Sequence, residues 1–528
     1  MSRTRRWRAV AGAALVAGAV LVTEVGAGAS PTVGDDVPVT AVDLSEIRAN
    51  NSPALAVDPT DARVVALASR VDLPVFGCAL HLSGDGGRGW VEVDPVPRLP
   101  DGADRCYAPE VGFDRHGTLY LLFVGLRGTG NTPMGAFLTT SPDRGRSFSP
   151  PRRVLGPHSF AVRMAIDPSL GALGRIHLVW IAAGAPPTLG GFAAVANPVM
   201  AAHSDDGGES FSAPVSLSDG RARVVAPALA VGPDHEVAVA YYDLGDDAVD
   251  YQGLEGPTWE GTWSLVATRS ADGGRTFPPA VVVDDAVVPP ERVMLIFTMP
   301  PPAVAAGGGG RLWAAWHDAR NGDWDVFVRR STDGGRTWGP PVRANDDPLA
   351  NGRHQYQPRL ALAAGGRLDV VFYDRRHDVD NVANHVSYTF SDDGGASFAP
   401  NVRLSALPSS SAVGPRYPIP SAAGLIEFGS RLGLVSADHA AVAAWTDTRN
   451  SRPGQQQDVF AAAVRFGPGP APARPGLRTG ILTALVGGVV LLAIAGLAGA
   501  RWRAVGSGPA PARAASRWSS GSDQGGER

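Results

Sequence analysis

Residues 331–338 read Ser-Thr-Asp-Gly-Gly-Arg-Thr-Trp, and this short stretch decides the fold because the chain repeats it. Its pattern is Ser-x-Asp-x-Gly-x-x-aromatic. Six copies start at serines separated by 58, 63, 66, 61 and 60 residues, namely Ser83, Ser141, Ser204, Ser270, Ser331 and Ser391. Six matches at nearly even spacing indicate an internal structural repeat of about 60 residues.

The residue types of the repeat suit a tight hairpin turn. A short Ser or Asp side chain can bond nearby backbone amides, and Gly adopts positive φ at little cost. The aromatic residue can pack between strands and anchor the loop. We therefore predict that the aspartates of the repeat are structural and not catalytic: Asp85, Asp143, Asp206, Asp272, Asp333 and Asp393.

This pattern is the Asp-box, or BNR, repeat, and over about residues 37–466 the chain resembles the sialidase-like β-propellers. The resemblance implies an all-β fold, a single propeller of four-stranded blades. It also places each box at the turn between the third and fourth strands of a blade, on the face away from the ligand.

The number of blades follows from counting first strands. Short β-branched runs bounded by Gly-Gly or Asp-Pro predict strands, and first strands start near seven positions: Pro53, Pro109, Arg163, Pro227, Pro301, Pro358 and Arg431. The last set, within 432–466, lacks a box and a fourth strand. Residues 38–43 share the Pro-Val-x-x-x-Asp form of two predicted fourth strands, so we expect the N-terminal segment to complete the last blade and remove an exposed edge. Seven blades are predicted, and six, as in sialidases, are the alternative.

The two ends of the chain indicate where it resides. Residues 1–29 combine an arginine-rich start, an apolar run and an Ala-x-Ala site, which is typical of a secretory signal peptide; Thr4-Arg5-Arg6 leaves a twin-arginine signal open. After a Pro/Gly linker at 467–477, residues 478–500 contain 22 consecutive uncharged residues, long enough to span roughly 33 Å as a helix. Arg501 and Arg503 favour a cytoplasmic C-terminus, and 501–528 is predicted to be disordered. We expect a single-pass membrane protein whose propeller, 30–466, lies outside the cell.

The composition of the chain limits the classes of ligand and cofactor that we expect it to bind. The formal net charge is −4, which argues against a general nucleic-acid-binding surface. The 11 histidines show no zinc spacing, so no metal and no cofactor are predicted. In an oxidising compartment Cys78 and Cys106 are expected to form a disulfide between neighbouring repeats, with two buried thiols as the alternative.

A second pattern, an aromatic or Thr residue followed by Asp and Arg, ends several predicted second strands. It gives the ligand-binding candidates Asp318 and Arg320, Asp374 and Arg376, and Asp447 and Arg449, with Asp243 in a partial copy and Asp72 in a looser one. These groups either surround a funnel mouth and bind a sugar through bidentate contacts or pair between adjacent blades and hold the ring shut. The sequence leaves both interpretations open.

Family sialidases use three arginines for the substrate carboxylate, a Tyr paired with Glu as nucleophile and an Asp acid/base, and the resemblance implies candidates for each role. They are Asp72 or Asp318 as acid/base, Tyr356 or Tyr417 as nucleophile, Glu110 or Glu255 as its base, and Arg163, Arg359 and Arg416 as anion clamps. The Arg-Ile-Pro motif expected near the first blade is missing, which puts catalysis in doubt.

The loop 244–262 places Trp259 among carboxylates, an arrangement that suits stacking on a sugar or a solvated insertion. Three functions remain: a membrane-anchored extracellular propeller that recognises a glycan or protein ligand on its funnel face, a retaining glycoside hydrolase of exo-sialidase type, or an envelope assembly scaffold. The missing motif and the seventh blade favour the first.

Overall fold

The computed structural model describes residues 31–40, 48–93, 98–183, 197–219, 223–247, 261–289, 300–415, 426–451 and 456–467. All of them belong to one compact unit. Several predicted features lie outside these residues: the signal peptide 1–29, the membrane helix 478–500, the tail 501–528, and the candidates Tyr417, Glu255, Arg416 and Trp259. Within the described ranges no helix is long and apolar enough to cross a membrane.

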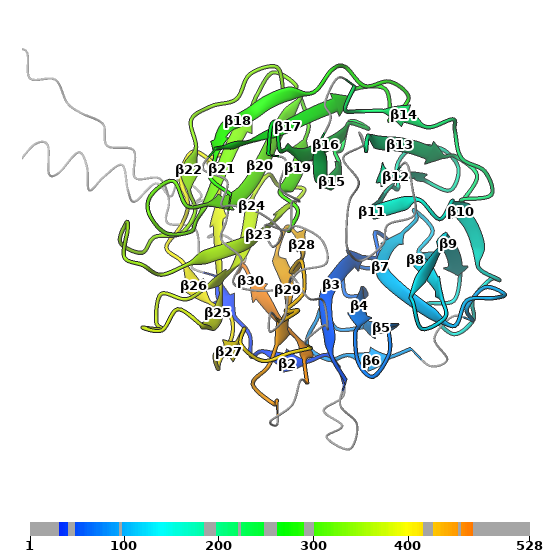
Figure 1. Ribbon diagram of the computed structural model, residues 1–528, viewed down its shortest axis with the longest axis horizontal. Coiled ribbons are helices and arrows are strands. Elements are labelled where there is room, and N and C mark those ends of the chain that lie inside the picture. The colour runs from blue at the N-terminus through cyan, green and yellow to red at the C-terminus, as the bar shows by residue number, and fades with distance from the viewer. Residues whose placement is uncertain are drawn as a thin grey trace, which may run out of the picture. The chain divides into compact units, whose positions relative to one another are not determined.

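Seven antiparallel sheets surround a common axis as the blades of a propeller (Figure 1). Blade one contains β3 (Asn50–Val57), β4 (Val65–Val71), β5 (Gly77–Ser83) and β6 (Val91–Glu92), and blade two contains β7 (Arg105–Phe113), β8 (Leu119–Arg127), β9 (Thr132–Ser141) and β10 (Arg152–Leu155). Blade three contains β11 (Ser159–Asp167), β12 (Arg175–Ala182), β13 (Val199–Ser204) and β14 (Val215–Ser216). Blade four contains β15 (Val224–Val231), β16 (Val237–Asp243), β17 (Trp263–Ser270) and β18 (Val281–Val287).

Blades five to seven continue the same order. Blade five contains β19 (Ala303–Gly307), β20 (Arg311–Asp318), β21 (Asp325–Ser331) and β22 (Val342–Arg343). Blade six contains β23 (Gln355–Leu362), β24 (Leu368–Asp374), β25 (Ala383–Ser391) and β26 (Val402–Arg403), and β27 (Ser409–Ser410) also pairs with β25. Blade seven contains β28 (Gly433–Ala437), β29 (Ala440–Asp447) and β30 (Asp458–Arg465), and β1 (Thr32–Val33) and β2 (Val37–Pro38) complete it. Each innermost strand contacts the next, and β28 contacts β3, so the ring is closed. The predicted seven blades are confirmed, and the six-blade alternative is wrong.

The N-terminal segment closes the ring by pairing with the last strand. Thr32 and Val33 pair with Arg465 and Val464, and the Val39 amide donates to the Val459 carbonyl at 2.8 Å. The closing segment therefore starts earlier than the predicted 38–43, because pairing with β30 begins at Thr32. Pro38 is tolerated there because this strand lies at the sheet edge and Pro supplies no amide.

Each Asp-box forms the hairpin between the third and fourth strands through the same short bonds. In the fifth box the Ser331 hydroxyl donates to Asp333 at 2.8 Å and accepts from the Gly335 amide at 2.9 Å. Asp333 in turn accepts from the Arg336 and Thr337 amides, both at 3.0 Å. Gly335 has a φ of +84°, a conformation that a residue with Cβ rarely adopts. The carboxylate and hydroxyl thus replace the backbone partners that the turn leaves unpaired.

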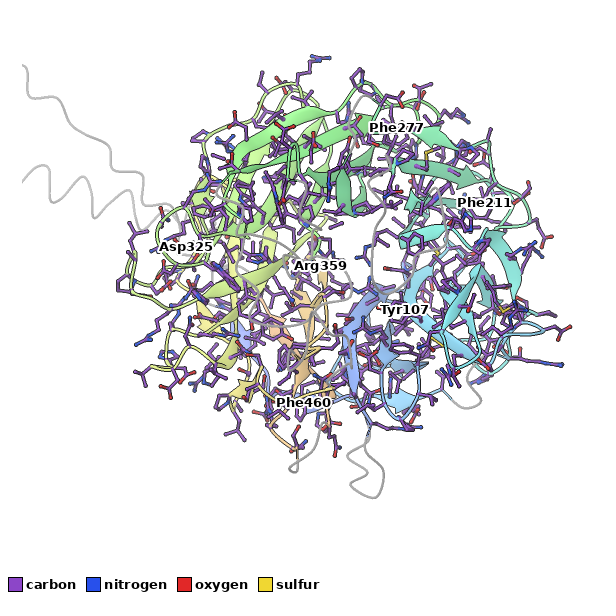
Figure 2. The ribbon with its side chains drawn as sticks, in the orientation of Figure 1. Tyr107, Phe211, Phe277, Asp325, Arg359 and Phe460 are labelled. Atoms are coloured by element: carbon purple, nitrogen blue, oxygen red, sulfur yellow. A yellow bond between two sulfur atoms is a disulfide. The ribbon has the colours of Figure 1, made fainter. Side chains whose placement is uncertain are left out.

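The apolar core lies between neighbouring sheets and not within any one of them. The cluster that contains Leu265 and Val283 of blade four also contains Leu312 and Trp316 of blade five, and the box residue Trp338 packs against it. The box aromatics Phe211 and Phe277 occupy equivalent places in other blades (Figure 2). Because second strands are packed on both faces, β24 is buried at every residue and reads as an almost continuous apolar run.

The sixth box offers a matched test of the hairpin bonds. Asp393 and its neighbour Asp392 are both exposed, and Asp393 accepts from the Ala396 amide at 2.9 Å and from the Ser397 amide at 3.0 Å. We expect Asp393→Ala to lower the free energy of unfolding by about 1.5–3 kcal/mol, since it leaves amides without a charged acceptor. Asp392→Ala should change it by less than about 0.5 kcal/mol. Urea unfolding measures both, and equal losses would contradict this explanation of the box.

Candidate functional site

A backbone bulge recurs in the innermost strand of five blades. The register of β3, β7, β11, β15 and β23 against the second strand shifts near the start of each strand. One residue of positive φ occupies each bulge: Ser52, Ala108, Ala161, Ala226 and Gln357. The extra residue brings positions three apart onto the same face of the sheet. Tyr107 and Glu110 of β7 are such a pair, because they lie opposite Val124 and Leu122, which share one face of β8.

Three charged residues that follow bulges, Glu110, Arg163 and Arg359, meet near the axis of the ring with Arg431, which precedes β28. We call these four residues the axial cluster. Glu110 accepts from Arg163 at 2.9 Å and also from Arg431. Arg431 reaches over blade one, with its Nη2 at 2.7 Å from the Pro109 carbonyl and its Nε at 3.2 Å from the Ser52 carbonyl. One carboxylate therefore joins blades two, three and seven.

Arg359 is the member of the axial cluster that the carboxylate does not neutralise. Its side chain is partly buried, and its buried Nε has no hydrogen-bond partner among the described residues. Burial, and then the like charges of Arg431 and Arg163, lower the pKa of Arg359 to about 10, against the opposing effect of Glu110. At neutral pH the cluster thus contains three guanidinium groups and one carboxylate, an excess of positive charge held where solvent screening is weak.

The carboxylate of the cluster stays ionised. Burial favours the neutral acid, but Arg431 and Arg163 outweigh that effect and hold the pKa of Glu110 below its usual value. Burial and the like charge of Arg431 lower the pKa of Arg163, and Glu110 and Tyr107 partly oppose them. Tyr107 is therefore near enough to Arg163 for the two groups to interact electrostatically. Figure 2 places Tyr107 and Arg359 on the inner side of the ring.

A second buried network adjoins the axial cluster at the joint between blades one and seven. Arg70 donates to Glu427 at 2.7 Å, to Asp72 at 2.8 Å and to the Tyr107 hydroxyl at 2.8 Å. Asp72 also accepts from Asn51 at 2.8 Å. With this network included, the four arginines exceed the three carboxylates by one charge. A single bound anionic group would balance the whole assembly.

The Asp–Arg pattern at the ends of second strands forms ties between blades. Arg320 bonds Asp318 at 2.6 Å and Asp284 of blade four at 2.8 Å. Arg449 bonds Asp447 at 2.7 Å and Asp36 at 2.6 Å, and so ties the N-terminal segment that completes blade seven to the second strand of the same blade. The structure therefore shows the pairing alternative, and a ligand-binding role for these residues stays a prediction. Asp243 accepts from the Gly245 amide at 3.1 Å.

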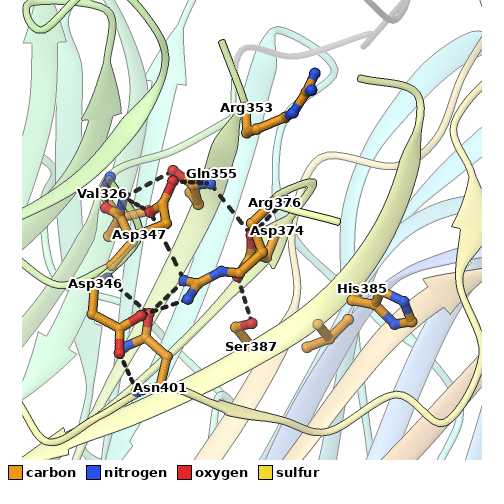
Figure 3. A network of polar contacts seen from close by, with 12 residues as sticks. Val326, Asp346, Asp347, Arg353, Gln355, Asp374, Arg376, His385, Ser387 and Asn401 are labelled. Atoms are coloured by element: carbon orange, nitrogen blue, oxygen red, sulfur yellow. Dashed lines mark hydrogen bonds and ion pairs between the residues drawn. The ribbon is translucent and has the colours of Figure 1, made fainter. Parts of the chain in front are cut away.

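Blade six shows the most extensive of these ties (Figure 3). Arg376 bonds Asp374 of its own blade at 2.6 Å and Asp346, which follows the outer strand of blade five, at 2.5 Å. It also donates to Asn401 at 2.7 Å. The guanidinium thus spans two blades, which fixes their relative position.

The remaining catalytic candidates have separate surroundings. Tyr356 is almost fully buried, its hydroxyl donates to Asn384 at 2.7 Å, and burial raises its pKa. Asp318 is buried and also accepts from the Trp316 indole at 2.7 Å. Among the described candidates for catalysis and anion clamping, the structure brings Glu110, Arg163 and Arg359 together, with Asp72 in the adjoining network. Their catalytic and binding roles stay predictions.

Sequence reasoning missed Arg431, Glu427 and Tyr107. Arg431 precedes β28, in which Gly433 holds the ladder position that Arg359 holds in blade six. A comparison of equivalent positions between repeats therefore does not find it. Glu427 lies in the connection from blade six to blade seven, where no repeat pattern exists. No group of His, Cys, Asp or Glu side chains placed to hold a metal ion occurs among the described residues.

Cys78 of β5 and Cys106 of β7 are joined by a disulfide with a Cα–Cα distance of 5.8 Å. The bond links blades one and two beside the second network, because Cys106 precedes Tyr107 and Cys78 lies opposite Arg70 in the sheet. It therefore joins the strand that carries Tyr107 to β5, which pairs with the strand that carries Arg70.

No family model and no curated protein matches the chain. Among solved structures, a protein of unknown function from Dyadobacter fermentans is 14% identical with a TM-score of 0.45, over 83% of this chain and 99% of that one. An α-L-arabinanase of Penicillium chrysogenum is 11% identical, with a TM-score of 0.41 over 82% and 98%. A Hadza microbial sialidase is 15% identical, with a TM-score of 0.42 over 76% and 74%. Such low similarity transfers no activity and no site residue.

Two substitutions test the charge balance of the axial cluster. Arg431→Met should lower the free energy of unfolding by about 3–5 kcal/mol, since it removes one of the two arginine partners of buried Glu110 and the arginine that bonds two backbone carbonyls. Arg359→Met should leave it unchanged or raise it by about 1 kcal/mol, because it removes a charge that no described group neutralises. Urea unfolding without added ligand measures both, and a loss for Arg359→Met as large as that for Arg431→Met would show that Arg359 is already paired.

Proposed function

We propose that this protein recognises an acidic ligand near the axis of its propeller, with Arg359 as the principal anchor. The observation that carries the proposal is the unneutralised guanidinium of Arg359 beside Arg163 and Arg431. An unpaired cation in a partly buried place costs stability, and a charge-assisted, bidentate contact with a carboxylate would offset that cost. The ligand class is a glycan or a protein that presents a carboxylate.

The site lies on the face of the ring opposite the Asp-boxes. The bulges occur near the start of the innermost strands. Each Asp-box follows a third strand, so it lies on the same face of the ring as the turn between the first and second strands. The starts of the innermost strands lie on the opposite face. Loops that join second to third strands surround the starts of the first strands, and such loops commonly carry function. This supports recognition on the funnel face.

The proposal extends to the location of the protein. The signal-like residues 1–29 and the uncharged stretch within 478–500 support export of the propeller and retention by one membrane helix. On this basis the propeller binds ligands outside the cell, and the C-terminal tail lies in the cytoplasm.

A retaining glycosidase of sialidase type is the second candidate. The observation that favours it is that Tyr107 and Glu110 share one face of β7 beside two arginines. The pair differs from the candidates that the sequence suggested, because Tyr356 bonds elsewhere. Recognition without turnover remains the proposal, since Glu110 is held by Arg163 and Arg431 and the Tyr107 hydroxyl by Arg70.

Binding and turnover can be separated on the full-length protein in detergent. Methyl β-D-glucuronide serves as a charged probe and methyl β-D-glucoside as its neutral counterpart, with a fluorogenic sialoside to detect hydrolysis. We expect the glucuronide to bind and the glucoside not to, and the sialoside to stay intact. Arg359→Met should weaken glucuronide binding at least about tenfold, since it removes a charge-assisted contact.

Arg403 provides a matched control, because it is an exposed arginine in the outer strand of the same blade. Arg403→Met should bind the glucuronide as the wild type does. Equal binding by Arg359→Met and wild type would overturn the proposal. If the wild type hydrolyses the sialoside and Arg359→Met does not, the protein is a glycosidase and the proposal of recognition without turnover is wrong.

A further inference from the structure

A buried histidine lies in the joint between blades one and seven, where the ring closes (Figure 1). His81 of β5 is 1% exposed and lies opposite Leu67 of β4 in the sheet. Side chains opposite each other in a sheet share a face, and Leu67 packs with Val459 and Ala461 of β30. The imidazole of His81 therefore faces blade seven and not blade two.

Neither nitrogen of this imidazole has a hydrogen-bond partner among the described residues, although both are buried. Ser69 Oγ and Trp90 Nε1 are also buried without a partner among those residues. Ser69 lies two residues from Leu67 on the same face of β4, and Trp90 packs against the apolar cluster that contains Leu67. The joint thus contains polar groups that it leaves unbonded, and a charge in such a place is costly.

Blades one and seven pack closely beside His81. The first Asp-box begins at Ser83, two residues after His81, and a Cβ added at its Gly87 would lie 2.8 Å from Cγ1 of Val442 in β29. A charged imidazole is stable only when water or a counter-charge reaches it. Hydration of a protonated His81 therefore requires the two blades to separate.

The charged groups of blade one nearest to His81 do not compensate a proton on it. Burial, and then the positive charge of Arg48, lower the pKa of His81 to about 4. Glu92 lies opposite His81 in the sheet, but it forms an ion pair with Arg48 at 3.7 Å, and both side chains are exposed. The carboxylate of Glu92 is therefore already engaged, in a place where water screens its charge.

Blade seven supplies no acidic partner for His81 either. The buried and half-buried acidic residues of β29, β30 and the closing segment bond to other groups, namely Asp447 and Asp36 to Arg449, and Asp458 to Thr40. Asp35 of the closing segment and Arg465 of β30 are exposed. Protonation of His81 thus leaves an uncompensated charge in the closed joint.

Blades one and seven are far apart in the chain and are held together by backbone bonds. The Asn50 amide donates to the Gln457 carbonyl at 2.8 Å, and the Gln457 amide donates to the Arg48 carbonyl at 3.0 Å. Other buried histidines, such as His177 and His317, lie in blades three and five, whose neighbours directly precede and follow them in the chain. Separation of blades one and seven, in contrast, opens the ring.

We propose that acid opens the ring at the joint between blades one and seven, because a protonated His81 is accommodated only when water reaches it. Opening separates Arg431 from Glu110 and Glu427 from Arg70, so the axial cluster comes apart with the joint. Acid opening is independent of the ligand that the axial cluster binds.

Proton linkage gives the direction and the size of the effect. The pKa of His81 is about 4 in the closed ring, below the ordinary value of 6.5, so the open state binds a proton more tightly. The closed state is fully favoured above pH 6.5 and loses stability as the pH falls from 6.5 towards 4. At pH 5 the ratio of closed to open molecules should be about thirtyfold lower than at pH 7.5.

Hydrogen exchange of the full-length protein in detergent measures this ratio, because the amides of Asn50 and Gln457 exchange only when their bonds across the joint break. After correction for the intrinsic pH dependence of exchange, their protection should be about thirtyfold lower at pH 5 than at pH 7.5. Protection of β8, the second strand of blade two, should change by less than about threefold.

His81→Leu removes the titrating group and no described hydrogen bond, so the joint should tolerate it. In this variant the protection of Asn50 and Gln457 at pH 5 should stay within about threefold of its value at pH 7.5. His439 provides the matched control, because it is an exposed histidine in the turn between β28 and β29. His439→Leu should lose protection as the wild type does.

The same loss of protection in His81→Leu as in the wild type would overturn the proposal. An equal loss in β8 would also overturn it, since acid would then unfold the whole propeller. Exchange of the imidazole Cε1 proton of His81, followed by mass spectrometry of the wild type, gives its pKa without a variant. A value near 6.5 would contradict the proposal, because the closed joint would then not resist protonation.

Discussion

Pairing of β1 and β2 with β30 is the interaction on which the rest of the structure depends. It supplies the outer strand of the last blade and holds that blade against the first. The charged residues of the site cross this joint. Arg431 of blade seven bonds Glu110 of blade two, and Glu427 bonds Arg70 of blade one. These groups are more than 300 residues apart in the chain, so they meet only when the ring is closed. Folding of the propeller and assembly of the site are therefore one event, not two.

The ring combines a repeated framework with a site that does not repeat. The Asp-box bonds and the bulges recur from blade to blade, which is the behaviour of parts that build the scaffold. Side chains at the equivalent positions after the bulges differ. Blades one and four carry Ala54 and Ala228 there, whereas blades two, three and six carry Glu110, Arg163 and Arg359. Charge is thus confined to part of the ring, and this asymmetry is what a binding site adds to a symmetric fold. The Asp–Arg ties, such as Arg376 with Asp374 and Asp346, repeat with the blades and belong to the scaffold.

The sequence predicts the framework well because its signals are local. A box such as 331–338 contains nearly all the partners of its own turn, and first strands repeat at similar spacing, so both the boxes and the seven blades follow from pattern alone. The closing strand was predicted from its resemblance to other fourth strands but began earlier than expected, since pairing with β30 is set by the partner. The site is harder. Glu110, Arg163 and Arg359 were named, yet nothing local shows that Arg431 is the second partner of Glu110. The choice between binding and pairing for Arg320 depended on Asp284, a contact between blades that no motif contains.

The central claim is that Arg359 provides a positive charge that an anion from solution neutralises. Anomalous scattering from crystals of the protein soaked in bromide tests it most directly. The account predicts a bromide peak within hydrogen-bonding distance of the Arg359 guanidinium, and its disappearance in crystals of Arg359→Met. Ordered bromide elsewhere on the protein with none beside Arg359 would contradict the account.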